Sequence, residues 1–175
     1  MSEVITLHES KWLGLYRIDT WDFARRPNSD CCVGILPITD QNEIVLIEQY
    51  RIPVGQLVIE IPAGLVGDEP EFHGESIADS AARELLEETG YRAGKVEAIL
   101  SSPTSAGMTS EFTHLFLATD LQRENDGGGT ANEEILVHHV PLCELRHFLA
   151  IKTKEGMAID FKIHAALAAA GIQFQ

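Results

Sequence analysis

The sequence predicts a mixed fold, α+β or mixed α/β, in which one sheet is largely antiparallel or mixed. Three observations predict it. The 175 residues fit one domain, about 45% of them are apolar, and most apolar runs are short and strand-like. One amphipathic helix interrupts these strands, and further helices close the chain. Because strands and helices do not alternate one by one, a doubly wound parallel sheet is not expected.

The predicted strands are apolar runs bounded by turn-forming residues. Residues 39–42, Thr-Asp-Gln-Asn, form such a turn between the strands predicted at 33–38 and 43–50. Shorter strands are expected near the N-terminus, at 4–7 and within 13–24. The remaining strands are predicted at 57–61, 95–100, 112–118 and 135–140.

The clearest predicted helix covers residues 76–89 and stops at Gly90. Pro141, which suits the first turn of a helix, opens a second helix predicted at 141–151. A third, Ala-rich helix is predicted at 160–170. The predicted order along the chain is therefore strands, one helix, more strands and then the two terminal helices.

Charge narrows the possible partners. The formal net charge is −14 and the isoelectric point is about 4.8. Such a surface repels nucleic acid and anionic membranes, so neither is expected as a partner. No apolar run approaches the roughly 20 residues of a membrane span, and residues 1–11 lack the apolar stretch of a signal peptide, which predicts a cytoplasmic protein. A phosphate-bearing substrate would also be repelled, so a phosphate site needs bound cations or a few placed arginines.

Three glutamates share one side of the helix predicted at 76–89. Glu84 and Glu88 are one turn apart and Glu87 neighbours Glu84, so all three fall within about 100° of arc. Their repulsion and their position near the C-terminal end disfavour the helix. A divalent cation would offset this cost, because Mg²⁺ prefers carboxylate oxygens. Arg83 is expected to offset part of the repulsion through Glu87, four residues on. The alternative, which charge clustering alone favours, is a solvated acidic face.

A longer pattern decides between these two interpretations. Residues 83–91, Arg-Glu-Leu-Leu-Glu-Glu-Thr-Gly-Tyr, resemble the second half of the Nudix box, G-x5-E-x7-R-E-U-x-E-E-x-G-U, where U is bulky and apolar. Seven residues lie between Glu75 and Arg83, as the box requires, and Gly64 fits its first glycine. Ten residues, 65–74, separate Gly64 from Glu75 where the box has five. The loop before the helix is therefore longer, while the metal-binding half is unaltered.

The resemblance extends over most of the chain. It is closest to Nudix pyrophosphatases that act on ADP-ribose and other nucleoside diphosphate sugars. It implies an α/β/α sandwich with a mixed sheet and a catalytic loop-helix-loop. The alternatives are another nucleotide substrate, such as GDP-mannose or a dinucleotide, and a catalytically silent ADP-ribose-binding protein. The segments that carry the similarity are residues 20–26 (TWDFARR), 48–51 (EQYR), 60–65 (EIPAGL), 106–111 (AGMTSE) and 132–135 (NEEI).

The resemblance also implies a metal cofactor, Mg²⁺ or Mn²⁺, in two or more ions. Glu84, Glu88 and the carbonyl oxygen of Ala63 are its implied ligands, and Glu87 is a ligand or a supporting acceptor. Arg83 and Glu87 are counted among the catalytic residues. Such a metal centre would offset the repulsion between the acidic chain and a diphosphate substrate.

A general base must lie near the metal-activated water. Residues 132–135 resemble the late acidic loop that supplies this base in the Nudix pyrophosphatases. Glu133 is therefore the first candidate for the base, Glu134 the second and Glu111 the third. Residues 124–132 contain a run of three glycines and are predicted to be a flexible loop that closes over substrate. The alternative is an ordinary acidic surface loop.

Charged residues elsewhere match substrate contacts. In the resemblance to the Nudix pyrophosphatases, Arg51 matches a phosphate-binding arginine and Arg26 matches another arginine that faces the substrate. A guanidinium can bind two phosphate oxygens at once. Surface ion pairs are the alternative for both. Glu60 is expected to accept hydrogen bonds from substrate or to support the metal site, and Glu111 is also placed among the substrate contacts.

The N-terminal tryptophans, Trp12 and Trp21, match positions where relatives stack an adenine between aromatic rings. In those relatives the two rings come from different subunits of a dimer that exchanges its N-terminal segments. Core or interface packing is the alternative. The resemblance therefore implies one Nudix domain over residues 1–175 in a homodimer, with 1–30 as the dimerisation strands and 31–175 as the catalytic core.

Overall fold

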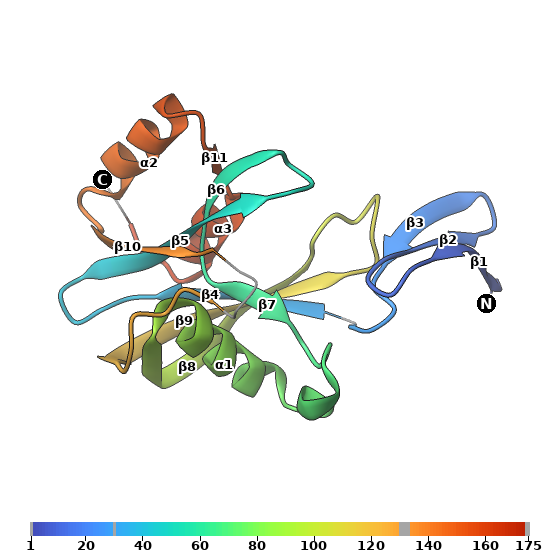
Figure 1. The fold of residues 1–175 in the computed structure, drawn as a ribbon, viewed down its shortest axis with the longest axis horizontal. Helices are drawn as coiled ribbons and strands as arrows, with labels where there is room; N and C mark the ends of the chain where they lie inside the picture. The colour runs from blue at the N-terminus through green and yellow to red at the C-terminus, as the bar shows by residue number, and fades with distance from the viewer. Residues whose placement is uncertain (1, 30, 130–133, 174–175) are drawn as a thin grey trace.

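The computed structural model describes residues 2–29, 31–129 and 134–173. Two four-stranded sheets and three α-helices form the body of the described chain, and a three-stranded sheet projects from one end of it (Figure 1). The predicted mixed α/β architecture is confirmed. No helix among the described residues is long and apolar enough to cross a membrane.

The first sheet of the body has the order β7-β4-β9-β8. Strands β4 and β9 run parallel, while β7 and β8 are antiparallel to their neighbours. The pairing of β8 with β9 shifts register between Ala98 and Leu100, where the strand bends. The bounds are β4 Cys31–Pro37, β7 Ala63–Leu65, β8 Tyr91–Pro103 and β9 Phe112–Arg123.

The second sheet has the order β10-β5-β6-β11, with only β6 and β11 parallel. Its central strand β5 is buried along most of its length, as its continuous apolar run predicts. The bounds are β5 Glu43–Arg51, β6 Gln56–Glu60, β10 Leu136–Pro141 and β11 Ala158–Ile159.

Helix α1 (Ile77–Thr89) covers one face of the first sheet. Ala81 and Leu85 are fully buried there among Val33 and Ile35 of β4. The side chain of Ser76 accepts a hydrogen bond from the amide of Asp79 and begins the helix. Gly90, at a φ of 75°, ends it in the left-handed conformation that glycine adopts without a steric cost.

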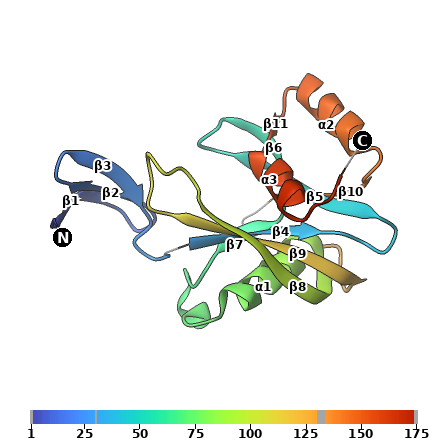
Figure 2. The ribbon, with the colours of Figure 1, turned by 180° about the vertical axis from the view of Figure 1, so that it is seen from behind.

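Helices α2 (Leu145–Lys154) and α3 (Phe161–Ala169) lie on the other side of the body, as the view from behind shows (Figure 2). Leu145 of α2 and Leu167 of α3 pack into one buried cluster with Leu36 of β4 and Leu46 of β5. The two sheets are thus enclosed between α1 and the C-terminal helices. This is the layered arrangement that the resemblance implies.

The N-terminal sheet consists of β1 (Val4–Glu9), β2 (Gly14–Ile18) and β3 (Trp21–Arg25). It joins the body through Ala24, whose amide donates to the carbonyl oxygen of Met108 (2.8 Å) and whose carbonyl oxygen accepts from the amide of Ser110 (3.3 Å). Every residue of β1 is exposed. The exposed apolar side chains of this sheet and its turns are Val4, Ile5, Leu7, Trp12, Leu13, Leu15 and Trp21.

Some predicted bounds are wrong. The helix predicted at 141–151 begins only at Leu145, because Pro141 is the last residue of β10 and pairs with Glu43. The strands predicted at 95–100 and 112–118 are longer, because β8 and β9 pair with each other into their polar ends. Strands β7 and β11 and the short 3-10 helix Pro70–Phe72 were not predicted, since each is too short to show a periodic pattern.

Candidate functional site

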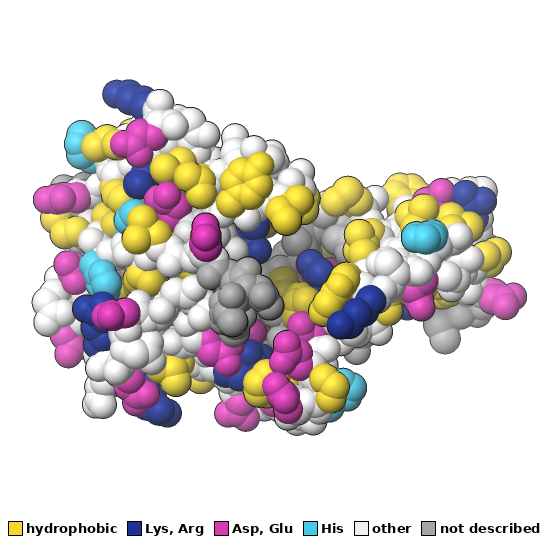
Figure 3. Space-filling model, viewed as in Figure 1, with side chains coloured by type: hydrophobic (Ala, Val, Ile, Leu, Met, Phe, Trp, Pro, Cys, Tyr) yellow, Lys and Arg dark blue, Asp and Glu magenta, His cyan; other side chains and the backbone are white. Residues whose placement is uncertain are grey.

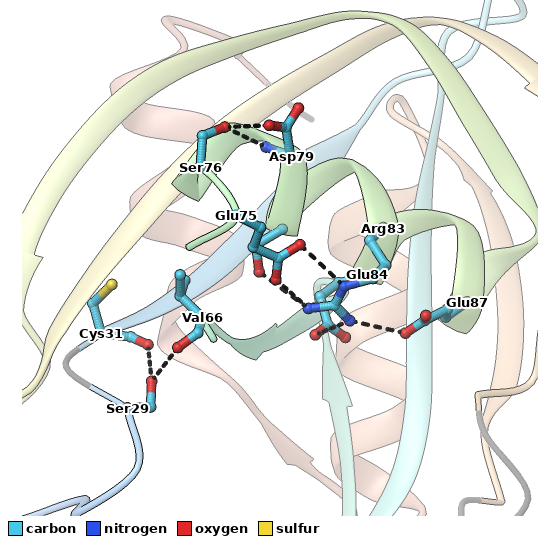
Figure 4. A network of polar contacts seen from close by, with 10 residues as sticks. Ser29, Cys31, Val66, Glu75, Ser76, Asp79, Arg83, Glu84 and Glu87 are labelled. Carbon is cyan, nitrogen blue, oxygen red and sulfur yellow. Dashed lines mark hydrogen bonds and ion pairs between the residues drawn. The ribbon is translucent and has the colours of Figure 1, made fainter. Parts of the chain in front are cut away.

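Arg83 lies at the centre of a network of carboxylates on and before α1 (Figure 4). Its Nη2 donates to Oε1 of Glu75 (2.8 Å) and its Nε donates to Oε2 (3.3 Å). Its Nη1 donates to Oε1 of Glu84 (2.9 Å) and to Oε2 of Glu87 (3.1 Å). The sequence predicted only the contact with Glu87. One guanidinium therefore offsets three carboxylates, which the fixed fork of an arginine allows.

Glu84 lies against the start of β7. A Cβ atom built on Gly64 would stand 1.9 Å from the carboxyl carbon of Glu84, so only a glycine leaves room for this side chain. Burial raises the pKa of Glu84 to about 7, and Glu87 and Asp68 contribute to the rise while Arg83 opposes it. Negative charge at Glu84 is thus only partly compensated by the chain itself.

Glu88 reaches the same segment from the next turn of α1. Its Oε2 accepts a hydrogen bond from the amide of Ala63 (2.9 Å), and only 4% of the residue is exposed. Of the predicted metal ligands, Glu84, Glu88 and the main chain of Ala63 therefore come together, while Glu87 is more exposed. Carboxylate and carbonyl oxygens are the donors that Mg²⁺ prefers, so these residues fit such an ion. Among the described residues, no group of three or more His, Cys, Asp or Glu side chains is already arranged to hold a metal ion.

Arg51 and Glu60, predicted as separate substrate contacts, form an ion pair. Nε of Arg51 donates to Oε1 of Glu60 (2.9 Å), and Nη2 donates to Oε2. Glu60 is buried, and Nε2 of Gln49 also donates to its Oε2 (3.4 Å). Burial lowers the pKa of Arg51, but the contacts with Glu60 and the charge of Glu88 outweigh burial and raise it. The pair is therefore within electrostatic reach of the carboxylates on α1.

The glycine run after β9 docks onto the C-terminal end of α1. The amide of Gly128 donates to the carbonyl oxygen of Glu88 (2.9 Å), and that of Gly129 donates to the carbonyl oxygen of Glu87 (3.1 Å). Gly127 has a φ of 67°, and a Cβ atom on it would stand 2.5 Å from the carbonyl carbon of Thr89. The segment predicted as a free loop is thus attached at its start, where its amides satisfy helix carbonyls that otherwise have no partner in the helix.

The structure describes two of the three candidate bases, Glu134 and Glu111. Glu133 lies outside the described residues. Glu134 is exposed, and the carbonyl oxygen of the next residue, Ile135, stands 3.8 Å from a Cβ atom built on Gly128. The segment therefore returns to the end of α1 just after Glu134. Glu111, the third candidate, is instead bound by Arg26, whose Nε donates to its Oε1 (2.8 Å).

The tryptophans lie far apart on the N-terminal sheet. Trp21 pairs with Ile18 at one end of β2, whereas Trp12 precedes Gly14 at the other end. Four residue steps along β2 already separate these ends by roughly 13 Å. Both indoles are more than half exposed, and Trp21 borders a cavity of about 380 Å³ with Phe23, Arg25 and Met108. The two tryptophans therefore lie at opposite ends of the N-terminal sheet.

The surface view shows acidic side chains gathered over α1 and the segment before it (Figure 3). They lie beside the hollow between the body and the N-terminal sheet. Basic side chains are interspersed among them. An anionic ligand entering this hollow would meet both signs of charge, which agrees with a site that needs arginines and a cation to hold phosphate.

The family described as the NUDIX domain matches residues 30–160, and the chain belongs to this family. It is 42% identical over 91 residues to the ADP-ribose pyrophosphatase of Bacillus subtilis, covering 51% of this chain and 45% of that protein. It is 35% identical over 117 residues to the methanol dehydrogenase activator of Bacillus methanolicus, covering 66% of this chain and 58% of that protein. These matches thus span roughly half the length of the two relatives.

Two further matches cover more of the chain. The chain is 34% identical over 182 residues to the GDP-mannose pyrophosphatase of Citrobacter koseri, covering 89% of this chain and 90% of that protein. A crystal structure described as an ADP compounds hydrolase superposes with a TM-score of 0.75 at 22% identity, covering 97% of this chain and 90% of that one. The second match shows that the fold is shared.

Sequence reasoning missed two contributors to this region, Phe72 and the docking of the glycine run. The ring of Phe72 lies 4.0 Å from the guanidinium carbon of Arg83. The extra length of the 65–74 segment is the only signal in the sequence that pointed toward Phe72. From the sequence alone the three consecutive glycines predict flexibility, whereas in the structure they allow close approach to a helix end.

We expect Glu84→Gln to change how stability depends on pH in metal-free protein. The folded-state pKa of Glu84 is raised from 4.5 to about 7, so the folded protein binds the proton more tightly than the unfolded chain. The stability of the wild type should therefore fall as pH rises from about 4.5 to 7. Urea unfolding at pH 5 and pH 8 should show that the variant lacks this loss and is more stable than the wild type at pH 8. Equal pH profiles for the two proteins would contradict the assignment, and Glu97→Gln, on the exposed face of β8, is the control.

Gly127→Ala should destabilise the protein more than Gly171→Ala. Both glycines have a φ of 67°, so both variants pay the left-handed cost of roughly 1–2 kcal/mol. Only Gly127 is in close contact with the backbone of α1, whereas nothing lies within 4 Å of a Cβ atom on Gly171. Urea unfolding should show the additional loss at Gly127. Equal losses would mean that the glycine run is not docked on the helix in solution.

Proposed function

We propose that this protein is a metal-dependent Nudix hydrolase. It cleaves the diphosphate of ADP-ribose, or of a related nucleoside diphosphate sugar, into a nucleoside monophosphate and a sugar phosphate. The convergence of Glu84 and Glu88 on the main chain of residues 63–64 carries the proposal. The names of the relatives from Bacillus subtilis and Citrobacter koseri, both pyrophosphatases of ADP-ribose or GDP-mannose, support the substrate class.

Glu84, Glu88 and the Ala63 carbonyl oxygen would hold the metal, and Glu87 would support it as a ligand or acceptor. Mg²⁺ or Mn²⁺, in two or more ions, would supply neutralising charge for the diphosphate and would acidify a bound water. Arg83 orients Glu84 and Glu87 through Nη1 while Glu75 holds its opposite edge. The acidic chain thereby gains a local site for an anion.

The remaining residues bind substrate and move a proton. Arg51 and Arg26 bind phosphate oxygens, and Glu60 and Glu111 hold these arginines by the ion pairs described above. A carboxylate from the loop after the glycine run accepts the proton of the attacking water. Glu133 is the first choice, although it lies outside the described residues, and Glu134 is the second. The docking of Gly128 and Gly129 on α1 supports this role, because it anchors the loop to the metal-binding helix.

The N-terminal sheet is proposed to make a homodimer. Residues 1–30 form the dimerisation segment and 31–175 the catalytic core of one domain. The exposed apolar side chains of the sheet support this, since such patches are rarely left to water. The separation of Trp12 from Trp21 supports it too, because a base stacked between two such rings needs a second chain. We propose a cytoplasmic location, and neither nucleic acid nor a membrane as partner.

GDP-mannose is the second candidate substrate. The match to the GDP-mannose pyrophosphatase of Citrobacter koseri covers most of both chains, which favours it specifically. ADP-ribose and GDP-mannose differ in base and sugar, so they would be distinguished at the N-terminal sheet rather than at α1.

Purified protein with Mg²⁺ should hydrolyse at least one member of a panel of nucleoside diphosphate sugars, dinucleotides and nucleoside triphosphates. Product masses in ¹⁸O-labelled water identify the phosphorus that is attacked. Glu84→Gln should lower turnover by more than about 100-fold, since even partners of metal ligands are worth about 10- to 100-fold. Glu97→Gln should leave turnover unchanged. An inactive wild type, or an active Glu84→Gln variant, would refute the proposal, and binding of nucleotide sugar without turnover would favour a silent binding protein.

Sedimentation at micromolar concentration should give twice the 19.3 kDa mass of one chain. Leu15→Glu, in the exposed apolar set of the N-terminal sheet, should yield monomer because it buries a charge in the interface. Ile52→Glu changes an equally apolar residue that is 83% exposed in the turn after β5, and it should remain dimeric. A monomeric wild type would overturn the dimer.

A further inference from the structure

The longer loop before α1 has a specific partner in the carboxylate network. We propose that Phe72, from residues 65–74, is a positioning residue that holds the guanidinium of Arg83 in place between Glu75, Glu84 and Glu87. The consequence for metal binding rests on the proposed function, whereas the contact itself is a property of the fold. This contact gives the additional residues of the loop a role.

Phe72 is fixed by its main chain on both sides. It ends the 3-10 helix Pro70–Phe72, and its amide donates to the carbonyl oxygen of Glu69 (3.0 Å). Its own carbonyl oxygen accepts from the amide of Glu75 (3.1 Å). The ring is thus attached three residues before the carboxylate that binds the outer edge of Arg83. Ring and carboxylate therefore hold the guanidinium from two directions.

The start of the loop is also tied to the body. The hydroxyl of Ser29 shares its one proton between the carbonyl oxygens of Val66 (2.9 Å) and Cys31 (2.8 Å), as Figure 4 shows. Phe72 belongs to neither of the two buried apolar clusters formed by the described residues. Its ring therefore packs on Arg83 without being required by the hydrophobic core, which makes a substitution here tolerable to the fold.

The position of the guanidinium matters because of the oxygens it uses. Nη1 contacts Oε1 of Glu84 and Oε2 of Glu87, so it engages one oxygen of each carboxylate. The second oxygen of each can then coordinate a cation at the same time. A guanidinium is attracted to the face of an aromatic ring, which restricts its rotation about the long side chain. Without the ring, Arg83 can turn, and the repulsion between the two glutamates is offset less consistently.

Phe72→Leu tests this inference, because leucine keeps an apolar side chain but offers no ring face. Mn²⁺ binding is measured by calorimetry without substrate, and activity is measured against Mg²⁺ concentration. We expect Phe72→Leu to weaken Mn²⁺ binding and to raise the Mg²⁺ concentration for half-maximal activity by about 3- to 10-fold. Phe72→Tyr retains the ring and should stay within about 2-fold of the wild type.

Phe161→Leu is the matched control. Phe161 is an exposed phenylalanine at the start of α3, on the side of the body opposite α1, with Lys162 5.6 Å from the centroid of its ring. Its substitution should leave Mn²⁺ binding unchanged. Unchanged Mn²⁺ binding in Phe72→Leu overturns the inference, as does an equal loss in Phe72→Tyr. If the wild type binds Mn²⁺ but hydrolyses nothing in the substrate panel, the proposed function fails, while the binding measurements still decide the role of Phe72.

Discussion

The accumulation of carboxylates on one side of α1 is the constraint on which the rest of this region depends. Glu84, Glu87 and Glu88 repel one another near the helix end that already carries negative partial charge. Arg83 lies inside the cluster and offsets part of this repulsion. The amide of Ala63 donates to the side chain of Glu88, and the amides of Gly128 and Gly129 donate to main-chain oxygens of α1. Gly64 leaves room for the side chain of Glu84. Burial, with smaller contributions from Glu87 and Asp68, still raises the pKa of Glu84 against the effect of Arg83, so the charged form of this side chain is not fully compensated. A helix whose carboxylates repel one another without a cation is expected to be stabilised when a cation binds.

The separate parts of this region are joined where two backbone segments approach α1 closely. Gly64 brings the start of β7 against Glu84, and Gly127 brings the segment after β9 against Thr89. A side chain at either position would push these segments away from α1. The same contacts connect the carboxylate helix to the strand before it and to the acidic loop after it. Small residues therefore determine the geometry of a site whose chemistry belongs to large charged ones.

The N-terminal sheet stands apart from this compact region. It touches the body mainly where Ala24 meets the loop at residues 104–111, and the Arg26–Glu111 pair lies beside that junction. Its tryptophans are more than half exposed and do not belong to the core. Under the proposed function, hydrolysis at α1 and recognition of the base at the N-terminal sheet would be separated in space.

The sequence by itself determined what depends on neighbours along the chain. The Ser76 and Gly90 ends of α1, the side shared by its glutamates and the family that the Nudix box defines all follow from local spacing, because a helix repeats every few residues. Only the tertiary structure decided the extent of β8 and β9, the pairing of Arg51 with Glu60, the docking of Gly127 to Gly129 on α1 and the ring of Phe72 against Arg83. Most of these contacts join residues from different elements or from loops without a periodic pattern. Their geometry is set by packing, which no periodicity in the sequence records.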